Sequence, residues 1–197
     1  MPEIRLRPYE KNVAALVDED DYQRLKDFVW YGKPGHTRIY ATRWVEGPND
    51  IARRQLHQDV LQIHLPKGYV IDHIDRNPLN CRKENLRVCT CQQNCFNQEV
   101  RKSKTSSKYK NVLLRKRKCE TGRLHKSPWF VRVSRDGIRV ESLTFADEYD
   151  AWKKSHQMLK KYHGEFANLA PWTGYSQHPY NQWFLKNHTA KGPLTSF

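Results

Sequence analysis

A short stretch, residues 70–98, is dense in side chains that could cut a phosphodiester bond. The stretch reads VIDHIDRNPLNCRKENLRVCTCQQNCFNQ and contains the adjacent pair Asp72 and His73, then Asn85, then Asn94. Hydrolysis of a phosphodiester needs an activated water, neutralisation of charge in the transition state and a stabilised leaving oxygen. A neutral imidazole can take a proton from water near pH 7. One hard divalent cation on oxygen ligands can meet the other two needs.

The elements around these residues favour their convergence. Residues 69–74 are rich in β-branched side chains and predict a strand, residues 76–84 are crowded with turn formers, residues 86–90 predict a second strand, and residues 92–98 can start a helix. In a strand, Asp72 and His73 point to opposite faces, so one can hold a metal while the other addresses the water. Asn94, near the start of the helix, can bring a second oxygen ligand back to Asp72.

The whole string resembles the HNH nucleases, in the variant whose last histidine is replaced by asparagine. The matching residues are Asp72-His73-Ile74-Asp75, Asn77-Pro78-Leu79-Asn80, Glu84-Asn85-Leu86-Arg87, Gln93-Asn94 and Asn97. The resemblance implies that His73 is the general base and that Asp72 and Asn94 bind one Mg²⁺ or Mn²⁺. It also implies that Asn85 ties the long loop so that His73 is held in orientation.

Several neighbouring residues have a second interpretation. Asp75 and Asn97 are either accessory site residues or local hydrogen-bonding groups. His57 and His64 are expected to pack or to face DNA. The clustered cysteines, Cys81, Cys89, Cys91 and Cys95, are expected to be free thiols and not a zinc site, because only the last two approach the spacing of a zinc knuckle.

A second group of side chains, beyond residue 107, suits DNA binding. Residues 110–118, 129–135 and 137–145 predict three strands, with an Asp136-Gly137 hairpin turn between the last two, and Asp147 can cap a helix to His163. Alternation should place Trp129, Val131 and Val133 under the helix. The outer face should then present Lys110, Arg115, Arg117, Phe130, Arg132 and Arg139 to a major groove.

This segment resembles the APETALA/ethylene-response-factor type of DNA-binding domain, in which a three-stranded sheet reads DNA. The similarity rests on Tyr109-Lys110-Asn111-Val112, Trp129, Leu143-Thr144-Phe145, the helix containing Ala151, and His163-Gly164-Glu165-Phe166-Ala167-Asn168. Asn111 stands where that family usually has glycine.

The rest of the chain completes an expected α+β organisation: a ββα-metal HNH nuclease unit plus a three-stranded antiparallel sheet packed on one helix. Before the nuclease segment we expect strands at 13–17 and 38–44, a helix at 19–28, and a further helix at 51–63. The expected divisions are a small module at 1–48, the nuclease domain at 49–98, a linker at 99–107, the sheet domain at 108–169, and an unassigned tail at 170–197.

The composition restricts the classes of partner. Of 197 residues, 35 are Lys or Arg and 21 are Asp or Glu, a formal net charge of +14 that attracts polyanions. A membrane binder should show a basic helix with an apolar face, and none is apparent. The polar start, the odd number of 5 cysteines and the lack of a long apolar run predict a protein of a reducing compartment, with no membrane association.

The pairing of an HNH unit with this kind of sheet domain resembles the homing-type endonucleases of phages and mobile introns, and the resemblance implies a DNA endonuclease of that type. We expect a monomer that nicks double-stranded DNA in the cytoplasm of a bacterial or phage-infected cell. Two alternatives are a non-catalytic DNA-binding regulator, in which the HNH unit is only a docking surface, and an RNA-binding protein suggested by charge alone.

Overall fold

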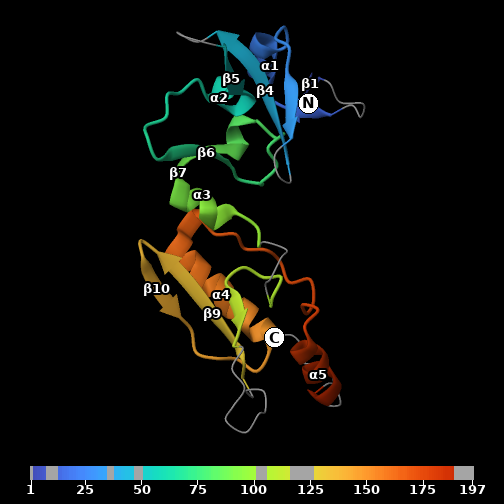
Figure 1. The fold of residues 1–197 in the computed structure, drawn as a ribbon, viewed down its shortest axis with the longest axis vertical. Helices are drawn as coiled ribbons and strands as arrows, with labels where there is room; N and C mark the ends of the chain where they lie inside the picture. Colours follow the sequence, from blue (N-terminus) through green and yellow to red (C-terminus); the bar gives the residue numbers. More distant parts are fainter. Residues whose placement is uncertain are drawn as a thin grey trace. The chain divides into compact units, whose positions relative to one another are not determined.

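The chain folds into two compact units, Met1–Asn97 and Gln98–Phe197, drawn in the computed structural model of Figure 1. The structure describes residues 2–7, 13–34, 38–46, 51–100, 106–115 and 127–188. Both units combine small antiparallel sheets with helices, which confirms the expected α+β class. Each unit has its own buried core, so each is described by itself.

The first unit begins with two small sheets. Its first elements are β1 (Glu3–Arg5), β2 (Ala14–Leu16), α1 (Glu19–Leu25), β3 (Tyr31–Pro34), β4 (Ile39–Glu46), β5 (Ile51–Gln55) and α2 (Leu56–Leu61). β1 pairs with β2, and β4 lies between β3 and β5 in an antiparallel sheet. The predicted strands and the helix after Asp18 are confirmed: β2 and α1 are shorter than predicted, whereas β4 runs on to Glu46.

The helix predicted over residues 51–63 is wrong in its first half. Ile51–Gln55 forms β5 and pairs along β4, from Glu46 opposite Ile51 to Thr42 opposite Gln55. The helix α2 starts only at Leu56, after a capping box in which the side chains of Gln55 and Gln58 bind each other's backbone N–H groups. It ends at Gln62, whose φ of 51° is left-handed.

The next elements follow the predicted order of strand, long loop, strand and helix. They are β6 (Tyr69–His73), the 3₁₀ turn η1 (Lys83–Asn85), β7 (Leu86–Thr90) and α3 (Cys91–Asn97). β6 and β7 are antiparallel, with Asp72 opposite Arg87 and His73 opposite Leu86. α3 packs against both strands.

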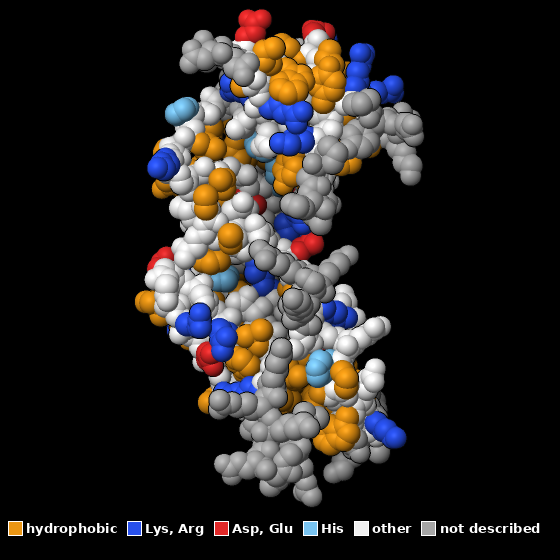
Figure 2. Space-filling view, viewed as in Figure 1, with side chains coloured by type: hydrophobic (Ala, Val, Ile, Leu, Met, Phe, Trp, Pro, Cys, Tyr) orange, Lys and Arg blue, Asp and Glu red, His pale blue; other side chains and the backbone are white. Residues whose placement is uncertain are grey.

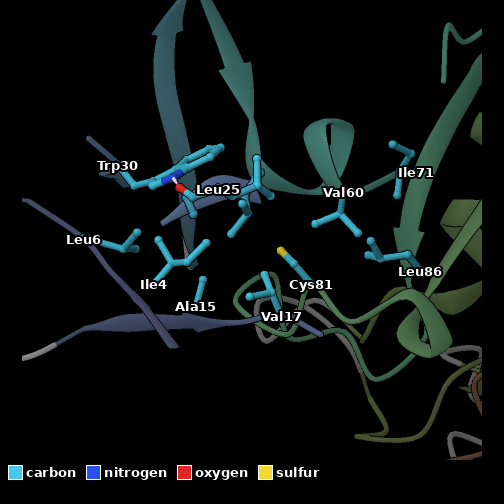
Figure 3. Packing of buried hydrophobic residues seen from close by; sticks show 12 residues of the cluster. Ile4, Leu6, Ala15, Val17, Leu25, Trp30, Val60, Ile71, Cys81 and Leu86 are labelled. Atoms are coloured by element: carbon cyan, nitrogen blue, oxygen red, sulfur yellow. Dashed lines mark hydrogen bonds between the residues drawn. The ribbon is translucent and has the colours of Figure 1, made fainter. Parts of the chain in front are cut away.

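One apolar core joins most of these elements. Figure 3 shows side chains from β1, α1, α2, β6 and β7 meeting, including Ile4, Leu25, Val60, Ile71 and Leu86. The indole Nε1 of Trp30 donates to the Leu25 carbonyl at 3.0 Å inside this core. The core therefore extends across the division that the sequence suggested between 1–48 and 49–98, and the N-terminal strands help to position the β6–β7 hairpin.

The second unit is a three-stranded sheet with a long helix on one face. Its elements are β8 (Val112–Leu114), β9 (Trp129–Arg135), β10 (Ile138–Glu141), α4 (Glu148–His163), the 3₁₀ turn η2 (Gly164–Phe166) and α5 (Pro179–His188). The strand order is β10-β9-β8, all antiparallel, and α4 packs on β8 and β9. The predicted arrangement of three strands on one helix is present.

Two local features of this unit follow from backbone chemistry. Asp136 and Gly137 have φ angles of 52° and 78° and close the predicted two-residue hairpin between Arg135 and Ile138. Asn111 also has a left-handed φ, of 64°, and its side chain donates to the Arg132 carbonyl at 2.6 Å. A left-handed backbone explains how Asn can stand at a position where glycine would be favoured.

The C-terminal tail is more ordered than the sequence indicated. Ser107 and the stretch around Ser176 and Asn181 converge on the carboxylate of Glu148, which is 0% exposed. The hydroxyls of Ser107 and Ser176 donate to it at 2.6 Å, and the Asn181 amide donates at 2.5 Å. Ser107, predicted to end a linker, and Ser176 and Asn181 of the unassigned tail are thus packed in the second unit. None of the helices in the described ranges is long and apolar enough to cross a bilayer.

Candidate active site

The last two residues of β6, Asp72 and His73, lie at the centre of the candidate site. Both are 6% exposed. Their contacts lie on opposite sides of the strand, as alternation predicts: Asp72 contacts residues of β7 and α3, whereas His73 contacts His57 and Tyr40.

The carboxylate of Asp72 has two partners. Arg87, directly opposite on β7, donates from its guanidinium Nη2 to Oδ2 at 2.8 Å and from Nε at 3.0 Å. Asn97 at the end of α3 donates its amide to both carboxylate oxygens, at 3.1 and 3.0 Å. A buried carboxylate with a cation and an amide on it has its charge compensated.

Asn97 also fastens α3 to the end of β6. Its amide reaches the backbone carbonyl of His73 at 2.9 Å in addition to Asp72. Asn94, the predicted second ligand, lies one helical turn earlier and is half-buried. Among the hydrogen bonds of the described residues none joins Asn94 to Asp72, and Asn97 makes the direct contact with that carboxylate. The expected role of Asn94 as a second ligand of a metal ion stays a prediction.

The imidazole of His73 is enclosed by other rings and a thiol. The ring centroid lies 5.1 Å from that of His57 on α2 and 6.5 Å from that of Tyr40 on β4, both in edge-on arrangements. The Cys81 Sγ lies 3.9 Å from Nε2. Burial lowers the pKa of His73, against the opposing effects of Asp75 and Asp72, so the imidazole is neutral near pH 7.

Asn85 ties the long loop back to β6. Its side-chain oxygen accepts from the backbone N–H of Asp75 at 2.9 Å, and its amide donates to the Asp75 carboxylate at 2.9 Å and to the Asn80 carbonyl at 2.7 Å. Its own carbonyl accepts from the N–H of Ile74 at 2.9 Å. These four bonds hold the backbone that immediately follows His73.

Asp75 is an organising residue of the same loop. It accepts from the Asn80 amide at 2.7 Å and from the backbone N–H of Asn77 at 2.8 Å. Burial raises the pKa of Asp75, but the hydrogen bonds from Asn80, Asn77 and Asn85 outweigh it and leave that pKa below its usual value. The carboxylate is therefore engaged within the loop.

The residue types around Asp72 suit a hard divalent ion. A carboxylate and a nearby amide are oxygen donors of the kind that Mg²⁺ and Mn²⁺ take. In this structure the counterion of Asp72 is the guanidinium of Arg87. The donor set therefore fits by chemistry, and Arg87 would have to give up at least part of its contact for a cation to bind Asp72 directly.

The cysteines of the segment fall into two pairs. Cys81 and Cys89 are buried, and burial raises their thiol pKa values to about 12 and about 11, so both stay protonated. Cys91 and Cys95 are exposed on α3. All four are free thiols.

The outer face of the second sheet carries part of the predicted DNA-binding set. Arg139 is exposed on β10, and Arg132 on β9 forms an ion pair with Glu141 at 2.6 Å. The guanidinium carbons of Arg115 and Arg132 lie 5.5 and 5.4 Å from the ring centroid of Phe130.

Three members of the set need comment. Lys110 is not on this face: its Nζ donates to the Gln98 carbonyl at 2.6 Å, and the residue lines a small cavity beside α4. Phe130 lies on the outer side of β9 by alternation but is only 6% exposed, so its ring is buried and not presented to solvent. Arg117 lies outside the described residues.

Sequence reasoning missed the roles of Arg87 and His57. The signal for Arg87 was its register: in an antiparallel pair with His73 opposite Leu86, the next residue pair places Arg87 opposite Asp72. His57 gave no such signal, because its contact with His73 depends on where α2 packs.

Comparison with known proteins agrees with this geometry. Residues 55–95 match the profile of the HNH endonuclease family, a range that includes α2, β6, β7 and most of α3. This segment is therefore an HNH endonuclease domain, and the chain is a nuclease. HNH nucleases generally use a divalent metal and act on DNA.

Two relatives come from viruses. The chain is 29% identical over 162 residues to the Uncharacterized HNH endonuclease L560 of Acanthamoeba polyphaga mimivirus, covering 80% of this chain and 74% of that protein. It is 52% identical over 42 residues to Protein 3.8 of Escherichia phage T7, covering 21% of this chain and 35% of that protein. No solved structure matches.

Proposed function

We propose that the protein is a homing-type endonuclease that nicks double-stranded DNA. The observation that carries this proposal is the placement of Asp72 and His73 at the end of β6, inside the segment that matches the nuclease family. α3 brings Asn94 and Asn97 to the same hairpin, and Asn85 fixes the adjoining loop. One such site acts on one strand per encounter, so a nick is the expected product of a monomer.

Asp72 and Asn94 would hold one Mg²⁺ or Mn²⁺. When bound, such an ion supplies neutralisation of phosphate charge and stabilisation of the leaving oxygen. Asn97 keeps Asp72 oriented by donating to both carboxylate oxygens. Because Asn97 also holds the His73 carbonyl, the helix and the strand end stay in fixed register.

His73 would accept the proton of the attacking water. Its burial keeps the ring neutral near pH 7, which leaves a nitrogen lone pair available as a base. The edge-on contact with His57 and the Asn85 bonds that follow His73 in the chain restrict the orientation of the ring.

The second unit would dock on DNA through its outer sheet face, in the manner of the APETALA/ethylene-response-factor domains. Arg115, Arg132 and Arg139 are the cations of this face, and an ordered sheet over α4 gives them a rigid support. The proposed divisions remain a nuclease domain at 49–98 and a sheet domain at 108–169. The viral and phage origin of the relatives favours action in the cytoplasm of an infected cell.

A plasmid assay tests this function. Supercoiled plasmid is incubated with the wild type, His73→Ala and the matched control His64→Ala, which removes an exposed histidine of the same segment. With Mg²⁺ or Mn²⁺ the wild type and the control should yield open circles, and His73→Ala should not. Plasmid left supercoiled by all three proteins would overturn the proposal.

A non-catalytic DNA-binding regulator is the second candidate. The observation in its favour is that the carboxylate of Asp72 is already paired with Arg87 and Asn97. Binding of duplex DNA without nicking, under both metals, would support this candidate. Tighter binding of duplex RNA than of duplex DNA would argue against major-groove docking by the second sheet.

A further inference from the structure

The sheet of β3, β4 and β5 has one face in the core and one face open. Ala41 on β4 and Trp30, just before β3, are buried in the first core. The strand register puts Tyr31 opposite Thr42, Lys33 opposite Tyr40, and Trp44 opposite Arg53. Residues opposite each other on neighbouring strands point to the same face, so these six side chains lie away from Ala41. Thr42 is buried, at 3% exposed, so this face is open at Tyr31, Lys33, Trp44 and Arg53 and not along its whole length.

Large apolar side chains are exposed on this open face. Tyr31 is 37% exposed, Trp44 50% and Ile51 62%. Contiguous exposed apolar patches, especially those rimmed by polar residues, mark interaction sites on proteins. Figure 2 shows hydrophobic and basic side chains next to one another on this unit.

Cations accompany the aromatic residues. Lys33 and Arg53 are exposed on β3 and β5, and the guanidinium carbon of Arg53 lies 4.5 Å from the ring centroid of Trp44. Arg7 forms a parallel bridge with Tyr31, which adds a third exposed cation beside β3. Glu46, at the end of β4, is the acid of this face among the described strand residues. The excess of positively charged over negatively charged side chains favours an anionic ligand.

The open face continues to the candidate active site. Tyr40 is on this face by register, and its ring centroid lies 6.5 Å from that of His73. Arg38, just before β4, donates to the carbonyl of Arg76 in the long loop at 2.6 Å. All of these residues belong to the first unit, so the position of this surface relative to the candidate active site is defined.

We propose that the open face of β3–β5, with Arg7, Lys33, Trp44 and Arg53, binds the phosphate backbone of duplex DNA beside the bond that His73 addresses. The proposal rests on the proposed nuclease function. Phosphates are the anions that a cutting site at His73 must have on either side of the scissile bond. Cations held on strands next to that site would fix the duplex in place independently of the second unit.

The test measures DNA binding and not cutting. Affinity of the full-length protein for a fluorescent duplex is measured in EDTA over a series of salt concentrations. Each lost phosphate contact lowers the slope of log affinity against log salt by about 0.9. For Lys33→Gln/Arg53→Gln we therefore expect the slope to fall by about 2.

Two further variants control the interpretation. Lys26→Gln/Lys160→Gln removes the same charge from two exposed positions that are not on β3, β4 or β5, one just after α1 and one in α4, and should keep the wild-type slope. Lys33→Arg/Arg53→Lys keeps both positive charges and should also keep the wild-type slope. This variant separates the loss of charge from any effect of the substitutions on folding.

The outcomes test the proposed DNA-binding surface separately from the proposed nuclease function. An unchanged slope for Lys33→Gln/Arg53→Gln would overturn the proposed phosphate-binding role of this surface, even if the wild type nicks plasmid. An equal fall in the Lys26/Lys160 variant would overturn it too, since net charge alone would then explain binding. A reduced slope confined to Lys33→Gln/Arg53→Gln supports the surface, even if the wild type fails to nick.

Discussion

Arg87 and a divalent ion compete for the same carboxylate. Arg87→Gln removes the guanidinium that lies 2.8 Å from Asp72, so we expect Mn²⁺ to bind about tenfold more tightly, a gain of ~1.4 kcal/mol. The metal-free variant should also be less stable, because a buried carboxylate loses its counterion. Isothermal titration calorimetry and thermal unfolding measure both effects.

Arg54→Gln is a matched control for this experiment, because it removes an arginine that pairs with Asp59 in the same unit. Its Mn²⁺ affinity should equal that of the wild type. Weaker Mn²⁺ binding by Arg87→Gln would contradict the competition and make Arg87 part of the ion's site.

His57 should make the stability of the protein depend on pH. Burial, and then the neighbouring His73, lowers the pKa of His57 from 6.5 to about 3. Below pH 6.5 the unfolded chain therefore binds a proton that the folded chain does not, and the free energy of unfolding falls as the pH falls toward 3. The slope from this group approaches about 1.4 kcal/mol per pH unit.

His57→Gln removes this proton-binding group. Denaturant unfolding of the variant at several pH values from about 4 to about 7, which cover most of the interval between the folded and unfolded pKa values, should show a weaker pH dependence than in the wild type. If the free energy of unfolding depends equally on pH in the two proteins, His57 is not the source of that dependence.

The residue types of the site were predictable from the sequence, but their pairing was only partly so. Asp72, His73 and Asn85 lie where strand alternation and the long loop suggested. Asn97, predicted as either an accessory site residue or a local hydrogen-bonding group, donates to the carboxylate of Asp72, whereas the metal-ligand role of Asn94 stays a prediction. The two asparagines are one turn apart on α3, and a sequence does not fix the rotation of a short helix about its axis.

At the scale of elements, the failures have a common cause in non-local contacts. Residues 51–63 have apolar side chains at helical spacing, yet Ile51–Gln55 is a strand because β4 offers a pairing edge. The tail was left unassigned because its order comes from Glu148, far away in the sequence. Local signals did hold: Asp147 caps α4 by accepting from the N–H of Tyr149 at 3.1 Å, as predicted.

The Glu148 cluster should be a major source of stability for the second unit. Glu148→Ala leaves Ser107, Ser176 and Asn181 without their buried acceptor, so we expect the free energy of unfolding to fall by about 3 kcal/mol. Chemical denaturation checks the value. Asp150→Ala, at an exposed position of the same helix turn, should cost well under half as much; an equal cost would contradict the role of the cluster.

At the scale of the whole molecule, the two units should fold separately. Each has its own core, centred on Trp30 and Leu56 in the first and on Trp129 and Val131 in the second. Fragments 1–97 and 98–197 should therefore each unfold cooperatively, with a sharp loss of circular dichroism on heating. A fragment that shows no transition would mean that its core needs the other unit.

The distribution of thiols allows the first unit to be labelled selectively at exposed cysteines. Cys91 and Cys95 are one helical turn apart on the exposed side of α3, whereas Cys81 and Cys89 are buried with raised pKa values. With the fifth cysteine, Cys119, replaced, a maleimide dye should react on the helix that carries Asn94 and Asn97. Such a label would report ion uptake by fluorescence, without any turnover of nucleic acid.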